Sequence, residues 1–162
     1  MSFPTPFDRY RGKVLPEWID LNDHMNVAYY TVLFDFATDV IYDEFGLGPL
    51  GDYKGRSNHG TMAAEAHNIF KQELLVDEAV GVISQIIGVD YKRLHMAHTM
   101  YRLSDGTHAA MQELMYLHVD LGARKVVPWP HTIMTKLEAA AAAHAAVAKP
   151  DWVGRRIAIP PR

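Results

Sequence analysis

The hydrophobic period of this sequence changes once, near residue 60, and that change limits the folds open to the chain. Between residues 27 and 45 apolar side chains recur at the i, i+3, i+4, i+7 spacing of one helical face. Further along, apolar and polar residues alternate in four runs separated by short polar joints: residues 61–74, 78–91, 93–106 and 107–121. A sheet with one amphipathic helix must bury that helix against one of its faces, so we predict a two-layer α+β domain whose strands form an antiparallel meander.

Turn signals and local propensity predict the remaining elements. We expect one short strand within residues 9–20, near a sheet edge because Pro16 interrupts it. Glycines between residues 46 and 60 favour a loop after the long helix. Residues 131–148 are rich in alanine and predict a C-terminal helix, whereas the prolines of residues 149–162 argue against another regular element.

Length and composition indicate one soluble domain. With 162 residues, of which 49% are hydrophobic, the chain is long enough for one core and short for two. The net charge of −3 gives no support for a nucleic-acid surface, although it does not exclude a small anionic ligand. Without cysteine the chain can form no disulfide, thiolate metal site or thiol nucleophile. No apolar run approaches the roughly 18 residues of a membrane span, so we expect a cytoplasmic protein without membrane contact.

The segment DLNDHMN, residues 20–26, carries two carboxylates, two carboxamides and a histidine directly before the long helix. Two interpretations are open. The segment is a solvated turn in which Asn26 caps the helix, or it is an active site built on a helix N-terminus. In the second case Asp20 supplies a base or nucleophile, and the unpaired first-turn amides of Val27 or Ala28, at the positive end of the helix dipole, bind a developing oxyanion.

In its context the segment resembles the hotdog-fold acyl-CoA thioesterases, in particular the branch of 4-hydroxybenzoyl-CoA thioesterase. The likeness covers roughly residues 9–135 and rests on EWIDLNDHMNVAYY, the long helix, the strands after it and the later LMYLHVDLGARKVVPWP. It implies a hotdog fold, an antiparallel sheet of about five strands wrapped around one long central helix. The hotdog thioesterase domain then spans residues 1–135, and residues 136–162 add a C-terminal helix and an irregular tail to the same domain.

The family pattern has an aspartate ending the first strand, a histidine four residues later and an asparagine two beyond that. Asp20, His24 and Asn26 match it. The resemblance implies that Asp20 is the general base or nucleophile of thioester hydrolysis and that the backbone N–H of Val27 polarises the carbonyl. His24 orients Asp20, contacts substrate or only bonds to the loop. Asp23 stands where many relatives have glycine and adds a second carboxylate. The resemblance implies no cofactor.

Adjacent cations at a predicted turn are candidates for binding coenzyme A. Lys92 and Arg93 lie between two predicted strands, where a solvated pair is the ordinary interpretation. The resemblance, however, places basic residues near this turn against the phosphates of coenzyme A. Arg124 and Lys125 are weaker candidates of the same kind.

Two further sets of titratable residues have weaker support. Glu65 and His67 share one face of a predicted strand, and some hotdog enzymes use an acid from elsewhere in the fold, so we include them as candidate substrate contacts. A polar pair on a sheet face is the alternative. Of the nine histidines only His95 and His98 are close in sequence, and residues three apart point to opposite faces of a strand. We therefore predict no metal site.

Three segments are similar to a thioesterase subgroup associated with carnitine breakdown that hydrolyses betainyl-CoA: residues 17–30, 93–110 and 117–130. A trimethylammonium group is recognised by aromatic faces, with a carboxylate as an optional extra. Tyr29, Tyr30, Phe34 and Trp129 are candidates for such faces, and Asp23 for the charge. The alternative is that Tyr30 and Phe34 pack in the core and that Trp129, between two prolines, only anchors the chain.

The resemblance also implies a homodimer or homotetramer, with substrate seated between protomers whose sheets pair edge to edge. Pairing would protect a sheet edge that otherwise invites non-specific association. The sequence fits three functions. The first is an acyl-CoA thioesterase acting on a short or polar acyl group. The others are a hotdog hydratase or dehydratase, with His24 or His67 moving a proton at carbon, and a non-catalytic acyl-CoA-binding module.

Overall fold

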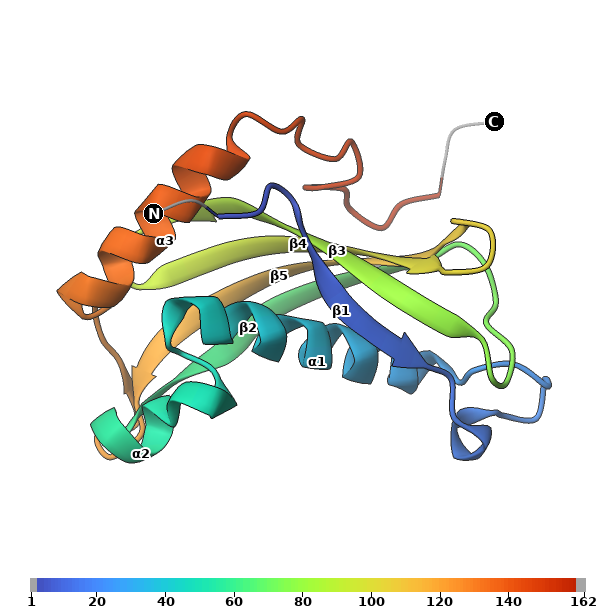
Figure 1. Ribbon diagram of the computed structural model, residues 1–162, viewed down its shortest axis with the longest axis horizontal. Helices are drawn as coiled ribbons and strands as arrows, with labels where there is room; N and C mark the ends of the chain where they lie inside the picture. Colours follow the sequence, from blue (N-terminus) through green and yellow to red (C-terminus); the bar gives the residue numbers. More distant parts are fainter. Residues whose placement is uncertain (1–2, 160–162) are drawn as a thin grey trace.

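The computed structural model describes residues 3–159 and shows a curled antiparallel sheet around one long helix (Figure 1). Within these residues the sheet contains five long strands and a short one: β1 (Phe7–Lys13), β2 (His59–Phe70), β3 (Ala79–Val89), β4 (Arg93–Arg102), β5 (His108–Asp120) and β6 (Lys125–Val126). The helices are α1 (Val27–Phe45), α2 (Tyr53–Ser57) and α3 (His131–His144), with 3-10 turns at Pro16–Trp18 and Pro49–Gly51. This is the predicted hotdog architecture of the α+β class.

The strand order is β1-β3-β4-β5-β2, which places β1 and β2 at the two edges of the sheet. Strands β3, β4 and β5 form the predicted meander. The predicted place of β2 beside β3 was wrong, because β2 pairs with β5 instead. The connection of residues 71–78 is not a tight turn. The backbone N–H of Lys71 donates to the carbonyl oxygen of Ala109 at the start of β5, and the N–H of Asp77 donates to the carbonyl oxygen of Val14 after β1. The connection thus crosses from one side of the sheet to the other.

Helix α1 begins and ends where the sequence predicts. The Asn26 side chain accepts the N–H of Ala28 at its start, and Gly46 adopts a left-handed conformation with φ of 77° at its end. The helix turns one face toward the sheet, and its buried side chains include Leu33, Phe34, Ala37, Ile41 and Phe45.

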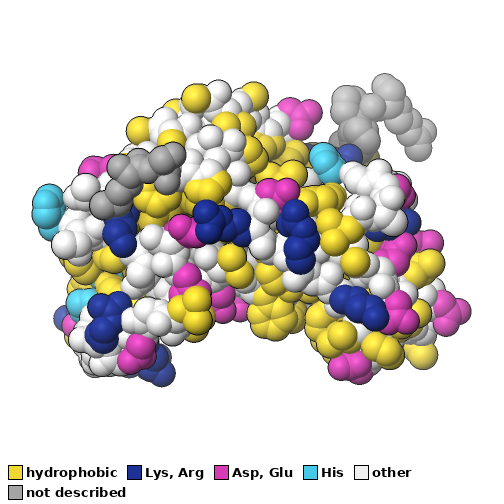
Figure 2. Space-filling view, in the orientation of Figure 1, with side chains coloured by type: hydrophobic (Ala, Val, Ile, Leu, Met, Phe, Trp, Pro, Cys, Tyr) yellow, Lys and Arg dark blue, Asp and Glu magenta, His cyan; other side chains and the backbone are white. Residues whose placement is uncertain are grey.

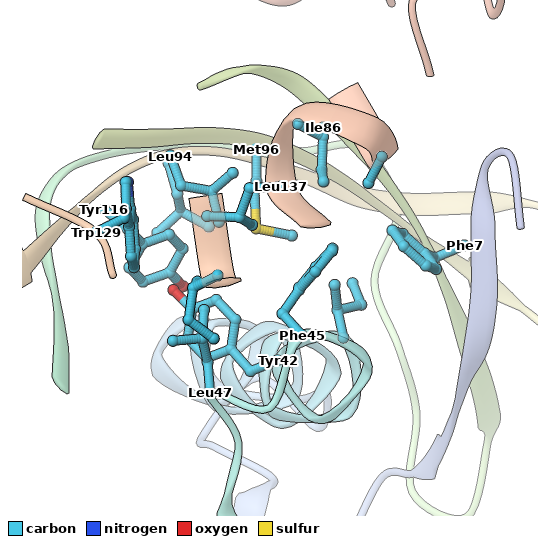
Figure 3. Close-up of a cluster of buried hydrophobic side chains, with 14 of the residues drawn as sticks. Phe7, Tyr42, Phe45, Leu47, Ile86, Leu94, Met96, Tyr116, Trp129 and Leu137 are labelled. Atoms are coloured by element: carbon cyan, nitrogen blue, oxygen red, sulfur yellow. The ribbon is translucent and has the colours of Figure 1, made fainter. Parts of the chain in front are cut away.

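Buried side chains fill the space between the sheet, α1 and α3 (Figure 3). Tyr42 and Phe45 reach into it from α1, Met96 from β4 and Leu137 from α3. A second cluster around Phe34 lies closer to the start of α1. Together the two clusters hold α1 rigidly along the sheet, which fixes the position of its N-terminus.

Helix α3 and the tail lie beyond the hotdog core in sequence but pack on it. Because α3 begins at His131, the boundary predicted between residues 135 and 136 falls inside this helix. The tail then crosses the sheet face that is turned away from α1, where the Gly154 N–H donates to Glu113 at 2.7 Å (Figure 1). Residues 160–162 of the predicted tail lie outside the described residues.

Two local predictions differ from the structure. β1 covers only Phe7–Lys13, because Pro16 starts a 3-10 turn that ends the extended conformation. Residues 46–60 are not one loop, since α2 forms there with the Asp52 carboxylate accepting the N–H of Gly55 at its start.

The surface beneath α1 is hollowed between two projecting ends, and hydrophobic side chains gather there (Figure 2). One end carries α2 and the other carries the loop before α1 (Figure 1). None of the helices formed by residues 3–159 combines the length and the apolar character needed to cross a membrane.

Candidate active site

The segment between β1 and α1 folds into a closed loop. Ile19 and Met25 form a β-bridge, and within it the Asp20 N–H donates to the carbonyl oxygen of His24 at 3.0 Å. Asp23 sits at the tip with a φ of 62°. Glycine adopts this left-handed conformation at no cost and aspartate tolerates it, which accounts for Asp23 at a position where glycine is common in the resembling family.

The Asp20 side chain is 22% exposed at the end of this loop. Its Oδ1 atom accepts the backbone N–H of Asn22 at 2.8 Å. His24 lies beside it, with 3.9 Å between its Nδ1 and the same Oδ1. The carboxylate is thus oriented by the loop backbone, and its Oδ2 atom has no hydrogen-bond partner among residues 3–159.

The start of α1 offers one free amide next to this carboxylate. Asn26 uses its side-chain oxygen to accept the N–H of Ala28 at 3.0 Å, and its carbonyl oxygen accepts the N–H of Tyr29. The N–H of Val27 has no acceptor among the described residues. Of the two amides that the sequence leaves open, the geometry therefore favours Val27 as an oxyanion donor.

Asp20, His24 and Val27 line one cavity of about 380 Å³. Met25 and Tyr30 complete its wall on the side of α1, and the opposite wall comes from the end of β2 and the following residues: Phe70, Lys71, Gln72 and Glu73. A carboxylate and a free helix N-terminal amide in one cavity suit attack on a carbonyl carbon with stabilisation of the developing oxyanion.

Tyr30 closes the inner end of this cavity and is 4% exposed. Its ring meets Phe70 edge to face with 5.2 Å between centroids, and its hydroxyl donates to the carbonyl oxygen of Gln72 at 3.3 Å. Burial raises the pKa of the Tyr30 hydroxyl, and the nearby carboxylates of Glu73 and Asp20 act in the same direction. Phe70 and Glu73 were missed by sequence analysis, because only the pairing of β2 with β5 brings them to the start of α1.

Comparison with known proteins agrees with the resemblance noted in the sequence. The family described as the thioesterase-like superfamily matches residues 14–137. The chain belongs to this superfamily. It is therefore a hydrolase of the thioesterase family, and the cavity at the start of α1 is its candidate active site.

Two curated relatives of this thioesterase carry a more specific name. A betainyl-CoA thioesterase of Pseudomonas aeruginosa is 37% identical over 152 residues, which cover 94% of each chain. An L-carnitine dehydrogenase/betainyl-CoA thioesterase of a Rhizobium species is 34% identical over 88% of this chain, which spans 28% of that longer protein.

Two solved structures resemble the whole chain. A hypothetical protein of Staphylococcus aureus, solved in complex with CoA, has a TM-score of 0.85 and 25% identity, and the match covers 99% of this chain and 100% of that one. A putative thioesterase of Pseudomonas putida KT2440 has a TM-score of 0.81 and 32% identity over the same shares of the two chains.

The aromatic candidates of this thioesterase separate into two groups. Tyr30 lines the cavity, and Tyr29 stacks on Trp18 beside it with 5.2 Å between ring centroids. Phe34 is fully buried in the core and stacks on His98, and Trp129 is 5% exposed beyond the other end of α1. Neither Phe34 nor Trp129 lines the cavity, so we do not retain them as substrate contacts.

The basic candidates lie at the opposite end of the sheet from Asp20. The end of β1 pairs with Ala79 at the start of β3, whereas Lys92 and Arg93 follow the other end of β3, a strand about 33 Å long at 3.3 Å per residue. Arg93 forms an ion pair with Asp90 at 2.6 Å. Arg124 and Lys125 are exposed near the same end of the sheet.

Glu65 and His67 share one face of β2, but that face is turned away from α1. They line a separate cavity of about 520 Å³ under the tail, together with His95 and Glu113, whose side chains meet at 2.7 Å. The structure therefore does not bring Glu65 or His67 to Asp20. His98 points to the other face, into the core. Within residues 3–159 no three His, Asp or Glu side chains are grouped as metal ligands.

Proposed function

We propose that the protein hydrolyses an acyl-CoA thioester in the cavity at the start of α1. The observation that carries this proposal is the pairing of the Asp20 carboxylate with the free Val27 amide in one cavity. Membership of the thioesterase-like superfamily and the likeness to a protein solved with CoA support it.

In this proposal the thioester carbonyl oxygen accepts the Val27 N–H, and the positive end of the helix dipole stabilises the negative charge that develops there. Asp20 either takes a proton from the attacking water or attacks the carbonyl carbon itself. In the first route the water oxygen bonds to the carbonyl carbon, the C–S bond breaks and coenzyme A leaves as the thiol with the proton that Asp20 took. In the second route the C–S bond breaks as a mixed anhydride with Asp20 forms, coenzyme A leaves as the thiolate, and water then hydrolyses the anhydride to the free acid and the Asp20 carboxylate.

In a single turnover in ¹⁸O water, a first product without ¹⁸O, together with ¹⁸O in the Asp20 carboxylate, would identify attack by Asp20 followed by hydrolysis at the Asp20 carbonyl carbon. Water that attacks the acyl carbon always puts one ¹⁸O into the acid.

The acyl group that we propose is betainyl, the trimethylammonioacetyl group derived from glycine betaine. The name of the Pseudomonas aeruginosa relative, which matches nearly the full length of this chain, supports this choice. So does the fusion of a betainyl-CoA thioesterase to an L-carnitine dehydrogenase in the Rhizobium relative. Two neighbouring aromatic rings in the cavity suit a cationic group.

We further propose a homodimer in which β2 pairs with β2 of a second copy, with a tetramer as the larger alternative. β2 is a long edge strand, and Met62 on it is 55% exposed. Antiparallel pairing across a two-fold axis would reverse the partner's sheet, and so bring the partner's Lys92 and Arg93 turn to the end of the sheet that holds Asp20. The basic pair would then bind the phosphates of coenzyme A across the interface.

A thiol-release assay tests the proposed function and separates it from the alternatives. The panel contains betainyl-CoA, its neutral isostere 3,3-dimethylbutanoyl-CoA, butyryl-CoA and crotonyl-CoA. We expect release of coenzyme A, fastest with betainyl-CoA. Hydration of crotonyl-CoA without thiol release would indicate a hydratase, and binding without turnover would indicate a non-catalytic module. Faster cleavage of the neutral chains would overturn betainyl-CoA as the substrate and leave the thioesterase standing.

A further inference from the structure

The wall of the cavity opposite α1 carries a carboxylate that the proposed hydrolysis does not use. Glu73 is exposed in the connection after β2 and forms no ion pair with a basic residue among the described residues. It directly follows Gln72, whose carbonyl oxygen accepts the Tyr30 hydroxyl at 3.3 Å, and its charge acts to raise the Tyr30 pKa. The same wall carries Phe70, an aromatic side chain that is 45% exposed.

The size of a betainyl group restricts where its cation can lie. One methylene separates its nitrogen from the carbonyl carbon, so the two atoms are about 2.5 Å apart, as in a backbone N–Cα–C unit. If the carbonyl oxygen bonds to the Val27 amide, the trimethylammonium group must lie within about one helical turn of it. Tyr30 is three residues further along α1, about 4.5 Å in rise, and meets this condition.

The acidic side chains along the exposed side of α1 lie too far from the Val27 amide to contact the trimethylammonium group. Asp35 and Asp39 line another cavity with Tyr42, and they are eight and twelve residues beyond Val27. The rise of the helix places them about 12 and 18 Å further along. A betainyl cation held at the Val27 amide of the same chain does not extend that far.

Resting on the proposed thioesterase function, we infer that Tyr30, Phe70 and Glu73 form the subsite for a quaternary ammonium group and select cationic acyl-CoAs. Phe70 is 45% exposed and lines the cavity together with Tyr30, whose ring it meets edge to face, and the exposed carboxylate of Glu73 adds a negative charge to the same lining. The lining carries one lysine, Lys71, and two carboxylates, Asp20 and Glu73. A bound betainyl cation would therefore balance the charges of these side chains.

Two substitutions test the subsite without touching Asp20 or Val27. Glu73→Gln removes the charge, and Phe70→Leu removes the aromatic face but keeps an apolar side chain. The measured quantity is the ratio of kcat/KM for betainyl-CoA to kcat/KM for 3,3-dimethylbutanoyl-CoA, which has the same shape without charge. We expect each variant to lower this ratio about threefold to fivefold.

Glu17→Gln is the matched control, since Glu17 is exposed at the same end of the molecule but does not line the cavity. It should keep the wild-type ratio. A ratio that stays at the wild-type value in both Glu73→Gln and Phe70→Leu, or falls equally in Glu17→Gln, would overturn the inference.

A binding experiment separates this inference from the proposed function. Calorimetric titration of the Asp20→Asn protein with betainyl-CoA and with the isostere measures selectivity without turnover. We expect tighter binding of betainyl-CoA and a weaker preference when Glu73→Gln is added. Equal affinity for the two thioesters would overturn the subsite even if the wild-type protein hydrolyses both. Absence of hydrolysis together with a Glu73-dependent preference would overturn the enzyme assignment and leave the subsite intact.

Discussion

The Nδ1 atom of His24 lies 3.9 Å from Oδ1 of Asp20, beyond the distance of a hydrogen bond. The same Nδ1 lies 3.3 Å from the carbonyl oxygen of Met25, so the loop backbone and not the carboxylate orients the imidazole. The pair is therefore not arranged as a histidine base held by an acid. This geometry favours Asp20 itself as the group that acts on water or on the carbonyl carbon.

Replacing the Asp20 carboxylate should remove most of the activity. Asp20→Asn keeps the acceptor for the Asn22 N–H but cannot take a proton, so we expect kcat to fall by at least about 100-fold with the fold unchanged. Steady-state kinetics and circular dichroism measure the two quantities. Asp23→Asn is the matched control, because it removes a carboxylate three residues away that does not line the cavity. A folded Asp20→Asn enzyme with near wild-type kcat would refute the assignment.

A smaller effect is expected at His24. Because its ring is not hydrogen-bonded to Asp20, His24→Gln should lower kcat by about tenfold or less, through altered packing of the cavity wall rather than loss of the base. The pH profile of kcat should keep its shape. A loss as large as that of Asp20→Asn, with the acidic limb of the profile displaced, would show that His24 takes part in proton transfer.

The oxyanion donor can be tested through the backbone. Val27→Pro removes the free N–H at the first position of α1, where proline is favoured, and Asn26 before it already has the extended φ of −59° and ψ of 142° that a proline requires. We expect kcat to fall about 100-fold, the usual cost of one oxyanion donor. Val27→Ala keeps the N–H and alters a side chain that is 56% exposed, so it should stay near wild type. Equal activity of the two variants would exclude this amide.

The phosphate site is predicted to act across a dimer interface. Lys92→Ala should raise KM for acyl-CoA several-fold with little change in kcat, because phosphate contacts bind ground and transition states alike. Acyl-pantetheine, which lacks the nucleotide, should show no such change. An equal rise in KM for acyl-pantetheine would assign Lys92 another role.

Mixing two variants tests whether that site is shared between chains. In a mixed dimer of Asp20→Asn and Lys92→Ala, one site combines Asp20 of one chain with Lys92 of the other and is intact. After subunit exchange we therefore expect activity with the wild-type KM. If mixing leaves only the raised KM, Lys92 serves its own chain or does not contact the nucleotide.

Acid should destabilise the protein through buried histidines. Burial lowers the pKa of His98 from 6.5 to about 3, and its two ring nitrogens lie 2.7 Å from Ser84 Oγ and 3.2 Å from Thr38 Oγ1. Between pH 6.5 and 3 the unfolded chain therefore binds a proton at His98 that the folded chain does not bind. The contribution of His98 to stability is full above pH 6.5 and is lost as the pH falls toward 3. Burial lowers the pKa of His118 and His144 in the same direction.

Thermal unfolding as a function of pH checks this prediction. The melting temperature should fall steadily between pH 6.5 and 3 in the wild type and less steeply in His98→Gln, whatever the stability of that variant at neutral pH. An equal slope in the two proteins would mean that His98 is already charged in the folded state.

Local patterns in the sequence were enough for α1 and for the centre of the candidate site. The bounds of α1 follow from one apolar face, the Asn26 cap and Gly46, all of which act over a few residues. Asp20 and Val27 are seven residues apart and are joined by one closed loop, so their proximity is also a local property.

Only the tertiary structure decided which distant side chains surround that centre. Phe34 fits an aromatic substrate contact in sequence, but the rotation of α1 against the sheet buries it. Phe70 and Glu73 carry no local signal, yet they face Asp20 because β2 pairs with β5 rather than β3. Strand order depends on pairings between residues far apart in the chain, and the alternation that predicts a strand is the same whichever neighbour it has. The sequence by itself therefore determined α1, the four long strands after it and the Asp20 loop, and the pairing of the strands determined the shape and lining of the cavity.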